Sequence, residues 1–229
     1  MSDILTIGQG DGAFEGYLAL PRISNGMGIV LLGEVYNANH FIRGVADRYA
    51  AQGYTVLAPD LYWRLEPGQY LDYTPEGQRK ARELKARLDV GLAVADIDVA
   101  AQALLGQPGV RTAGVLGFCL GGQLAFAAGA RAEHIGAACG YYPIELQHHF
   151  HDAETLRVPT LVHFAELDER TPPDLIAAIR ERAAPRGATI HVYANALHGF
   201  GRVGYPPFKE DAAALAEQRS LDFFRTALS

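Results

Sequence analysis

Apolar and polar positions along the chain follow two alternating patterns, short unbroken apolar runs and longer stretches with helical periodicity. Residues 28–33 (GIVLLG) form an unbroken apolar run, as expected of a strand that is buried on both faces. In residues 38–52, Phe41, Val45 and Tyr49 recur at four-residue spacing, which is typical of one face of a helix. This part of the chain therefore predicts a buried strand followed by a helix.

The same alternation continues to the end of the chain. Two apolar segments at residues 4–7 and 13–20, joined by a glycine-rich turn, predict an N-terminal β-hairpin. The region 75–105 reads as one long helix, charged in its first half and apolar-periodic in its second. The other expected elements are strands at 55–59, 114–118, 136–142, 160–165 and 188–194 and helices at 120–131, 173–184 and 209–227. Such alternation predicts an α/β fold with a mostly parallel, doubly wound sheet flanked by helices.

Bulk properties narrow the class of protein. A chain of 229 residues that is 49% apolar suits a single domain over residues 1–229. A net charge of −6 argues against electrostatic binding to nucleic acid or to anionic lipid. There is no apolar run of about 18 residues to span a membrane, and the N-terminus lacks the pattern of a signal peptide. Two cysteines do not make a disulfide framework. We expect a cytoplasmic monomer that acts on a small molecule.

The chemically most informative segment is residues 117–122 (GFCLGG). It follows an apolar run and precedes a helical stretch, and a Gly-x-nucleophile-x-Gly turn in that setting is the nucleophile elbow of an α/β-hydrolase. The turn carries Cys119 where most such enzymes carry serine, which predicts attack by a thiolate on an acyl carbon. Cys139 lies inside a predicted strand and outside any such frame, so we expect it to be a small core residue.

Partners for this thiol follow in the order that the fold requires, nucleophile, acid and histidine. Asp168 lies just after the strand at 160–165, and His198 lies just after the strand at 188–194. The carboxyl ends of parallel strands share one edge of the sheet, where such folds bind their ligands. Taken singly, each residue is also typical of a turn or loop, and Glu166 is a rival for the acid.

These segments carry a resemblance to the dienelactone hydrolase (carboxymethylenebutenolidase) family of α/β-hydrolases. The matching pieces are residues 117–122, residues 58–62 (APDLY), residues 140–142 (GYY) and residues 196–200 (ALHGF). The resemblance implies hydrolysis of dienelactone, an unsaturated lactone that bears a carboxylate, to maleylacetate in the breakdown of chlorinated aromatic compounds. It also implies that neither a metal nor an organic cofactor is needed.

The resemblance assigns roles to further residues. It implies that Glu34 approaches the thiol when substrate binds and takes its proton, so that the oxidisable thiolate exists only when there is something to attack. It implies that Arg202 and Arg79 bind the substrate carboxylate, a task that suits the donor fork of arginine. By itself, Arg79 belongs to a mixed charged helix face that is usually solvated. The backbone N–H of Leu120, directly after the nucleophile, is one expected oxyanion donor.

The second oxyanion donor implied by the resemblance is the N–H of Val35. The chain departs from the family pattern at Asn37, which stands where a glycine is usual, and at Glu83, where an aromatic residue near Arg79 is common. These departures leave two other functions open. One is a general small-ester or thioester hydrolase of the same family, and the other is a redox-responsive binding protein on a hydrolase scaffold. The histidines at 148, 149 and 151 resemble a short metal-binding tract, but we expect a surface loop there.

Overall fold

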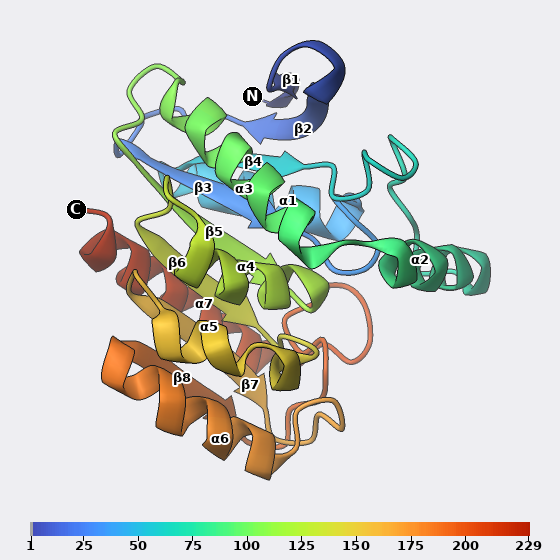
Figure 1. The fold of residues 1–229 in the computed structure, drawn as a ribbon, viewed down its shortest axis with the longest axis vertical. Helices are drawn as coiled ribbons and strands as arrows, with labels where there is room; N and C mark the ends of the chain where they lie inside the picture. Colours follow the sequence, from blue (N-terminus) through green and yellow to red (C-terminus); the bar gives the residue numbers. More distant parts are fainter. Residues whose placement is uncertain (1) are drawn as a thin grey trace.

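One mixed sheet of eight strands forms the centre of the computed structural model, which describes residues 2–229 (Figure 1). Its strands are β1 (Ser2–Ile7), β2 (Phe14–Ala19), β3 (Met27–Leu32), β4 (Thr55–Pro59), β5 (Thr112–Phe118), β6 (Ala137–Tyr141), β7 (Thr160–Ala165) and β8 (Ala188–Tyr193). Their order across the sheet is β1-β2-β4-β3-β5-β6-β7-β8. Only the β1–β2 and β2–β4 pairs are antiparallel. The predicted hairpin and the mostly parallel sheet are confirmed.

Helices cover both faces of this sheet. They are α1 (His40–Ala51), α2 (Pro75–Arg87), α3 (Val90–Leu105), α4 (Leu120–Arg131), α5 (Phe150–Thr155), α6 (Pro173–Ala183) and α7 (Glu210–Ala227), with short 3₁₀ turns at Gly10–Gly12, Leu146–His148 and Ala184–Arg186. Helices α3, α4, α5 and α6 pack side by side on one face (Figure 1). Helices α1 and α7 are joined by a 3.1 Å ion pair between Arg48 and Glu217 and cover the other face. Within residues 2–229 we find no helix whose length and apolar character would let it cross a membrane.

The single helix predicted over residues 75–105 is wrong, because the chain forms two helices there. Leu88 has the extended angles φ −69° and ψ 126°, which end α2. The carboxylate of Asp89 then accepts a hydrogen bond from the N–H of Leu92 and caps the start of α3. Helix α2 consequently points away from the sheet, whereas α3 lies along it (Figure 1).

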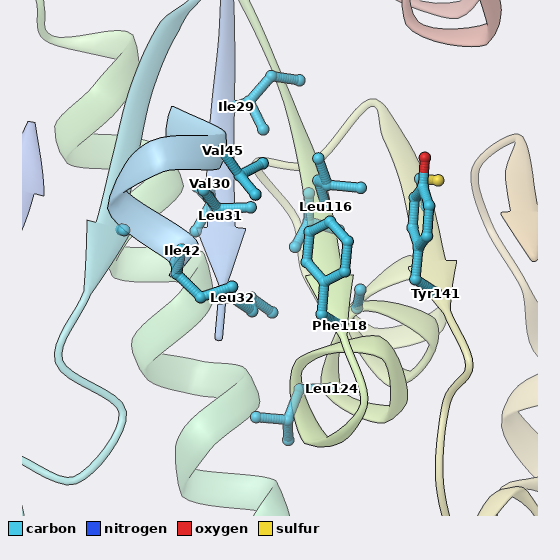
Figure 2. Close-up of a cluster of buried hydrophobic side chains, with 14 of the residues drawn as sticks. Ile29, Val30, Leu31, Leu32, Ile42, Val45, Leu116, Phe118, Leu124 and Tyr141 are labelled. Atoms are coloured by element: carbon cyan, nitrogen blue, oxygen red, sulfur yellow. The ribbon is translucent and has the colours of Figure 1, made fainter. Parts of the chain in front are cut away.

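Apolar packing fixes the end of β5, where the proposed nucleophile lies. Side chains of β3, β5 and β6 meet Ile42 and Val45 of α1 in one buried cluster (Figure 2). The ring of Phe118 packs on Tyr141 at 4.6 Å and on Phe41 at 5.5 Å between centroids. Burial of each such side chain contributes about 1.5–3 kcal/mol to the free energy of unfolding. Cys119, which directly follows Phe118, is therefore attached to a strand end that packing holds in place.

Candidate active site

Cys119 occupies a sharp turn between β5 and α4. Its backbone has φ 56° and ψ −110°, a conformation that non-glycine residues rarely adopt. Its N–H donates to the carbonyl of Tyr141 at 3.0 Å, which ties the turn to β6. The residue is 7% exposed and lies at the N-terminus of α4, which is the positive end of the helix dipole.

The glycines on both sides of Cys119 are there because no side chain fits. A Cβ atom on Gly117 would lie 1.9 Å from the carbonyl oxygen of Gly121, and one on Gly121 would lie 2.4 Å from that of Leu32. Both neighbours are backbone atoms that cannot move aside. The elbow predicted from sequence therefore has a direct steric cause.

We expect Gly121→Ala to lower the free energy of unfolding by about 1–3 kcal/mol, because overpacking forces the backbone apart. Esterase activity should fall with it, since the shift moves Cys119. Gly44→Ala in α1 is the matched control, because a Cβ there meets nothing within 4 Å. The control should stabilise by about 0.5–1 kcal/mol. Urea denaturation of both variants measures the difference, and an unchanged midpoint for Gly121→Ala would contradict the steric account.

Asp168 and His198 form a hydrogen-bonded pair beside the elbow. The Nδ1 of His198 lies 2.6 Å from Oδ2 of Asp168, whose side chain is fully buried. The other oxygen, Oδ1, accepts from the N–H of Arg170 at 3.0 Å. Glu166, the alternative acid, instead accepts from the N–H of Asn195 at 2.8 Å. Of the two carboxylates, the structure thus brings Asp168 to the imidazole.

The electrostatic surroundings of His198 favour its charged form. Burial by itself lowers the pKa of His198, but hydrogen bonds to Asp168 and Cys119 outweigh it and raise that pKa from 6.5 to about 9. Cys119 is thus one of the groups that act on the imidazole. Imidazole and carboxylate form a hydrogen-bonded pair, and the cysteine acts on the imidazole of that pair.

The loop after β3 lies against the elbow, and each of the two segments carries one of the N–H groups expected to bind an oxyanion. The N–H of Gly121 donates to the carbonyl of Gly33 at 2.9 Å, which places the loop after β3 against the elbow. Leu120 is the first residue of α4, so its N–H has no acceptor within the helix. Val35 is the second residue of the turn that Asn37 closes by donating to the carbonyl of Glu34, and the N–H at that position takes no part in the hydrogen bond of the turn.

Glu34 and Arg202, predicted to serve thiol and substrate respectively, are bonded to each other. The Nη2 of Arg202 lies 2.8 Å from Oε1 of Glu34, and its Nε lies 3.0 Å from Oε2. The hydroxyl of Tyr73 donates to Oε2 at 2.8 Å. Glu34 is only 1% exposed. The carboxylate is thus held by a guanidinium and a phenol, and Tyr73 is a site residue that sequence reasoning missed.

The structure does not bring Arg79 to this cluster. Its side chain is 71% exposed, and its guanidinium lies 3.9 Å from the carboxylate of Glu83. Its role as a second carboxylate ligand stays a prediction that this conformation does not support. Asn37, in contrast, keeps the loop shape that a glycine would allow, because it adopts φ 64° and its amide bonds to Asp60 at 2.6 Å.

Tyr142, which follows β6, packs against the histidine of the site. Tyr142 is fully buried and packs edge-on against the imidazole of His198 with ring centroids 5.0 Å apart. Within residues 2–229 its hydroxyl has no hydrogen-bond partner. Burial and the nearby carboxylate of Glu34 raise the pKa of Tyr142, which keeps this hydroxyl protonated.

The second cysteine lies away from this cluster, in the core. Cys139 is fully buried, and its Sγ lies 3.4 Å from Oγ of Ser220. Burial raises the pKa of Cys139 to about 12, so this thiol stays protonated.

The surface loop expected at the histidine-rich tract is wrong in part: His148 and His151 are exposed, but the tract is helical and His149 is buried. His149 is buried, with Nδ1 2.6 Å from Asp152 and Nε2 3.0 Å from the amide of Gln123. Arg131 in turn holds Asp152 with two hydrogen bonds of 2.6 and 2.7 Å. The tract therefore anchors α5 to α4. No group of three potential metal-ligating side chains occurs in the part of the chain that the structure describes.

A mostly parallel sheet, a strained strand-to-helix turn at Cys119 and an Asp168–His198 pair after β7 and β8 fit an α/β-hydrolase. The sequence matches the dienelactone hydrolase family over residues 14–228, and the chain belongs to that family. It is a hydrolase.

Individual relatives agree with this assignment. Carboxymethylenebutenolidase of Pseudomonas putida is 34% identical over 198 residues, which cover 85% of this chain and 84% of that one. Carboxymethylenebutenolidase of Pseudomonas sp. strain P51 is 30% identical over 224 residues, covering 95% and 92%. A solved structure from Klebsiella pneumoniae superposes with a TM-score of 0.86 over 98% of both chains at 24% identity. Dienelactone hydrolase of Anabaena variabilis gives a TM-score of 0.71 at 20% identity, over 100% of this chain and 99% of that one.

Proposed function

We propose that this protein is a cysteine-dependent hydrolase that opens dienelactone to maleylacetate through an acyl-enzyme, in the degradation of chlorinated aromatic compounds. The observation that carries the proposal is the hydrogen-bonded pair of His198 and Asp168 at the same sheet edge as the strained turn at Cys119. The names of the Pseudomonas relatives support the lactone as substrate. A working free thiol fits a reducing, cytoplasmic compartment.

In the first step the thiolate of Cys119 attacks the lactone carbonyl. The N–H groups of Leu120 and Val35 hold the oxyanion, and each such donor is worth about 2.7–4 kcal/mol of transition-state stabilisation. Collapse of the tetrahedral intermediate breaks the ring C–O bond. The leaving enolate stays attached to the acyl group, so the thioester contains every atom of the lactone.

In the second step water must cleave the thioester, and His198 is the base. Two of the influences that raise the pKa of His198 come from Cys119. Acylation removes these influences, and the enolate released in the first step takes the proton of the imidazolium, which leaves the imidazole neutral. The imidazole can then accept a proton from water, while Asp168 holds its orientation.

Glu34 supplies the proton transfer that makes the thiolate. A substrate carboxylate that binds Arg202 takes the place of the Glu34 carboxylate, which is now held there by two hydrogen bonds of 3.0 Å or less. The released Glu34 moves to the thiol and accepts its proton. Activation is thereby coupled to the arrival of an anionic substrate.

Arg202→Ala tests this coupling. Without its counter-charge the substrate carboxylate faces Glu34 directly, so KM for dienelactone should rise by about tenfold or more, whereas KM for its methyl ester should change little. Steady-state kinetics on both substrates gives the comparison, and a melting curve checks folding. Equal effects on the acid and the ester would contradict the assignment of Arg202.

A general small-ester or thioester hydrolase is the second candidate. It is favoured by the exposed position of Arg79, which leaves Arg202 as the one arginine of the predicted pair at the site. A wild-type kcat/KM for p-nitrophenyl acetate that equals or exceeds the value for dienelactone would support this candidate.

A further inference from the structure

The buried carboxylate of Glu34 shows what a carboxylate-binding site in this protein looks like when it is filled. Both of its oxygens are served: Oε1 by Arg202 Nη2 at 2.8 Å, and Oε2 by Arg202 Nε at 3.0 Å and by the Tyr73 hydroxyl at 2.8 Å. Oε1 also lies 3.2 Å from Nε. The donor set therefore has two parts, a guanidinium fork and a phenol.

The phenol is held in place by contacts that do not involve Glu34. The ring of Tyr73 packs against Tyr205 with centroids 4.5 Å apart and against Tyr36 at 4.6 Å. The guanidinium carbon of Arg202 lies 4.7 Å from the centre of the same ring. Tyr73 and Arg202 thus stay together as a unit when the carboxylate between them is exchanged.

An exchange of carboxylates would leave this hydroxyl needing a new acceptor. Burial and the Glu34 charge raise the pKa of Tyr73, so the hydroxyl stays protonated and remains a donor. A buried donor without an acceptor is costly, and an incoming carboxylate has the same two acceptor oxygens as the outgoing one.

We propose that the Tyr73 hydroxyl and the Arg202 guanidinium together form the subsite for the substrate carboxylate, with Glu34 as its occupant in the absence of substrate. The inference rests on the proposed displacement of Glu34. It assigns to Tyr73 the position that the family resemblance gives to Arg79, whose side chain points to solvent. Tyr73 is then a determinant of specificity for esters and lactones that carry a carboxylate.

The test uses two chromogenic esters of similar size, the mono-p-nitrophenyl ester of succinic acid and p-nitrophenyl valerate. Because Tyr73 donates to Glu34 as well, its contribution to substrate binding is clearest after Glu34→Ala has removed the resident carboxylate. In that background KM for the succinate ester should fall relative to the wild type. Adding Tyr73→Phe should raise it about tenfold and leave KM for the valerate ester unchanged, as expected for a lost hydrogen bond to a charged group.

Tyr205→Phe in the same background is the matched control, because it removes a hydroxyl from the ring that packs on Tyr73 and should leave both KM values unchanged. If the only role of Tyr73 is to hydrogen-bond Glu34, Tyr73→Phe will have no effect once Glu34 is absent. That result would overturn the proposal. If Glu34→Ala turns over too slowly for kinetics, the rise in melting temperature caused by succinate replaces KM. It should be present in Glu34→Ala and lost in the double variant.

Failure of the Tyr73 proposal and failure of the proposed function give different results. Wild-type protein that fails to open dienelactone would refute the lactone as substrate, while the ester pair and the succinate titration would still report whether Tyr73 recognises a carboxylate.

Discussion

Cys119→Ala will reduce dienelactone hydrolysis to less than about a hundredth of the wild-type rate, because the acyl-enzyme route loses its nucleophile. What remains is the oxyanion site and His198 acting on water, and general-base assistance alone supplies about 10²–10⁴ over the uncatalysed reaction. The decrease of dienelactone absorbance in the ultraviolet measures both rates. Retention of more than a hundredth of the activity would remove Cys119 from the role of nucleophile.

Cys139→Ala is the control for this variant. It removes the other cysteine, whose buried Sγ lies against Ser220 in the core. Its activity should stay close to that of the wild type, with a modest loss of stability from the small cavity. A selective effect at position 119 also speaks against a redox-responsive binding protein, for which ester turnover should be absent in the wild type.

Asp168→Asn will lower kcat by about 10³–10⁴. The asparagine keeps the shape of the side chain but does not stabilise an imidazolium, and comparable replacements in hydrolase triads have effects of this size. Thioester cleavage should be the step that suffers, because that is where His198 must act as a base. Glu166→Gln is the matched control, since Glu166 bonds to the backbone of Asn195. Similar losses in both variants would contradict the choice of Asp168.

The interaction of His198 with Asp168 also predicts how the free energy of unfolding depends on pH. Because the pKa of His198 is raised from 6.5 to about 9 by folding, its contribution to the free energy of unfolding is fully present below about pH 6.5 and is lost as the pH rises through about 9. The loss is on the order of 1–3 kcal/mol. Denaturation of the wild type at about pH 6.5 and about pH 9 should show this loss of stability. The loss should be smaller in Asp168→Asn.

The parts of the fold that sequence predicts well are those with a local cause. A strand buried on both faces must be apolar throughout, so runs such as 28–33 are visible in sequence, and a glycine-flanked turn between strand and helix identifies the elbow. The break at Leu88–Asp89 was missed because its N-cap carboxylate lies inside a charged, helix-like stretch. The burial of His149 depends on Arg131, which only the packing of α5 on α4 brings near.

The site residues also divide into those with a local sequence signal and those identified only by packing. Cys119, Asp168 and His198 each follow a strand, and parallel topology alone brings them to one edge. The pairing of Glu34 with Arg202 joins residues 168 positions apart and could not be predicted from either segment. Tyr73 carries no motif at all, since it is one aromatic residue before a helix cap, and only its contacts with Glu34 and Arg202 identify it.

Direct detection of the intermediate tests the central claim. Asp168→Asn mixed with dienelactone, quenched in acid within the first turnover and analysed by mass spectrometry should show protein heavier by the mass of one whole lactone, because ring opening releases nothing. Digestion should place the added mass on the peptide that contains Cys119, and the adduct should be absent when Cys119→Ala is added to the variant. Product formation with no adduct at any time, or an adduct on another residue, would contradict the account.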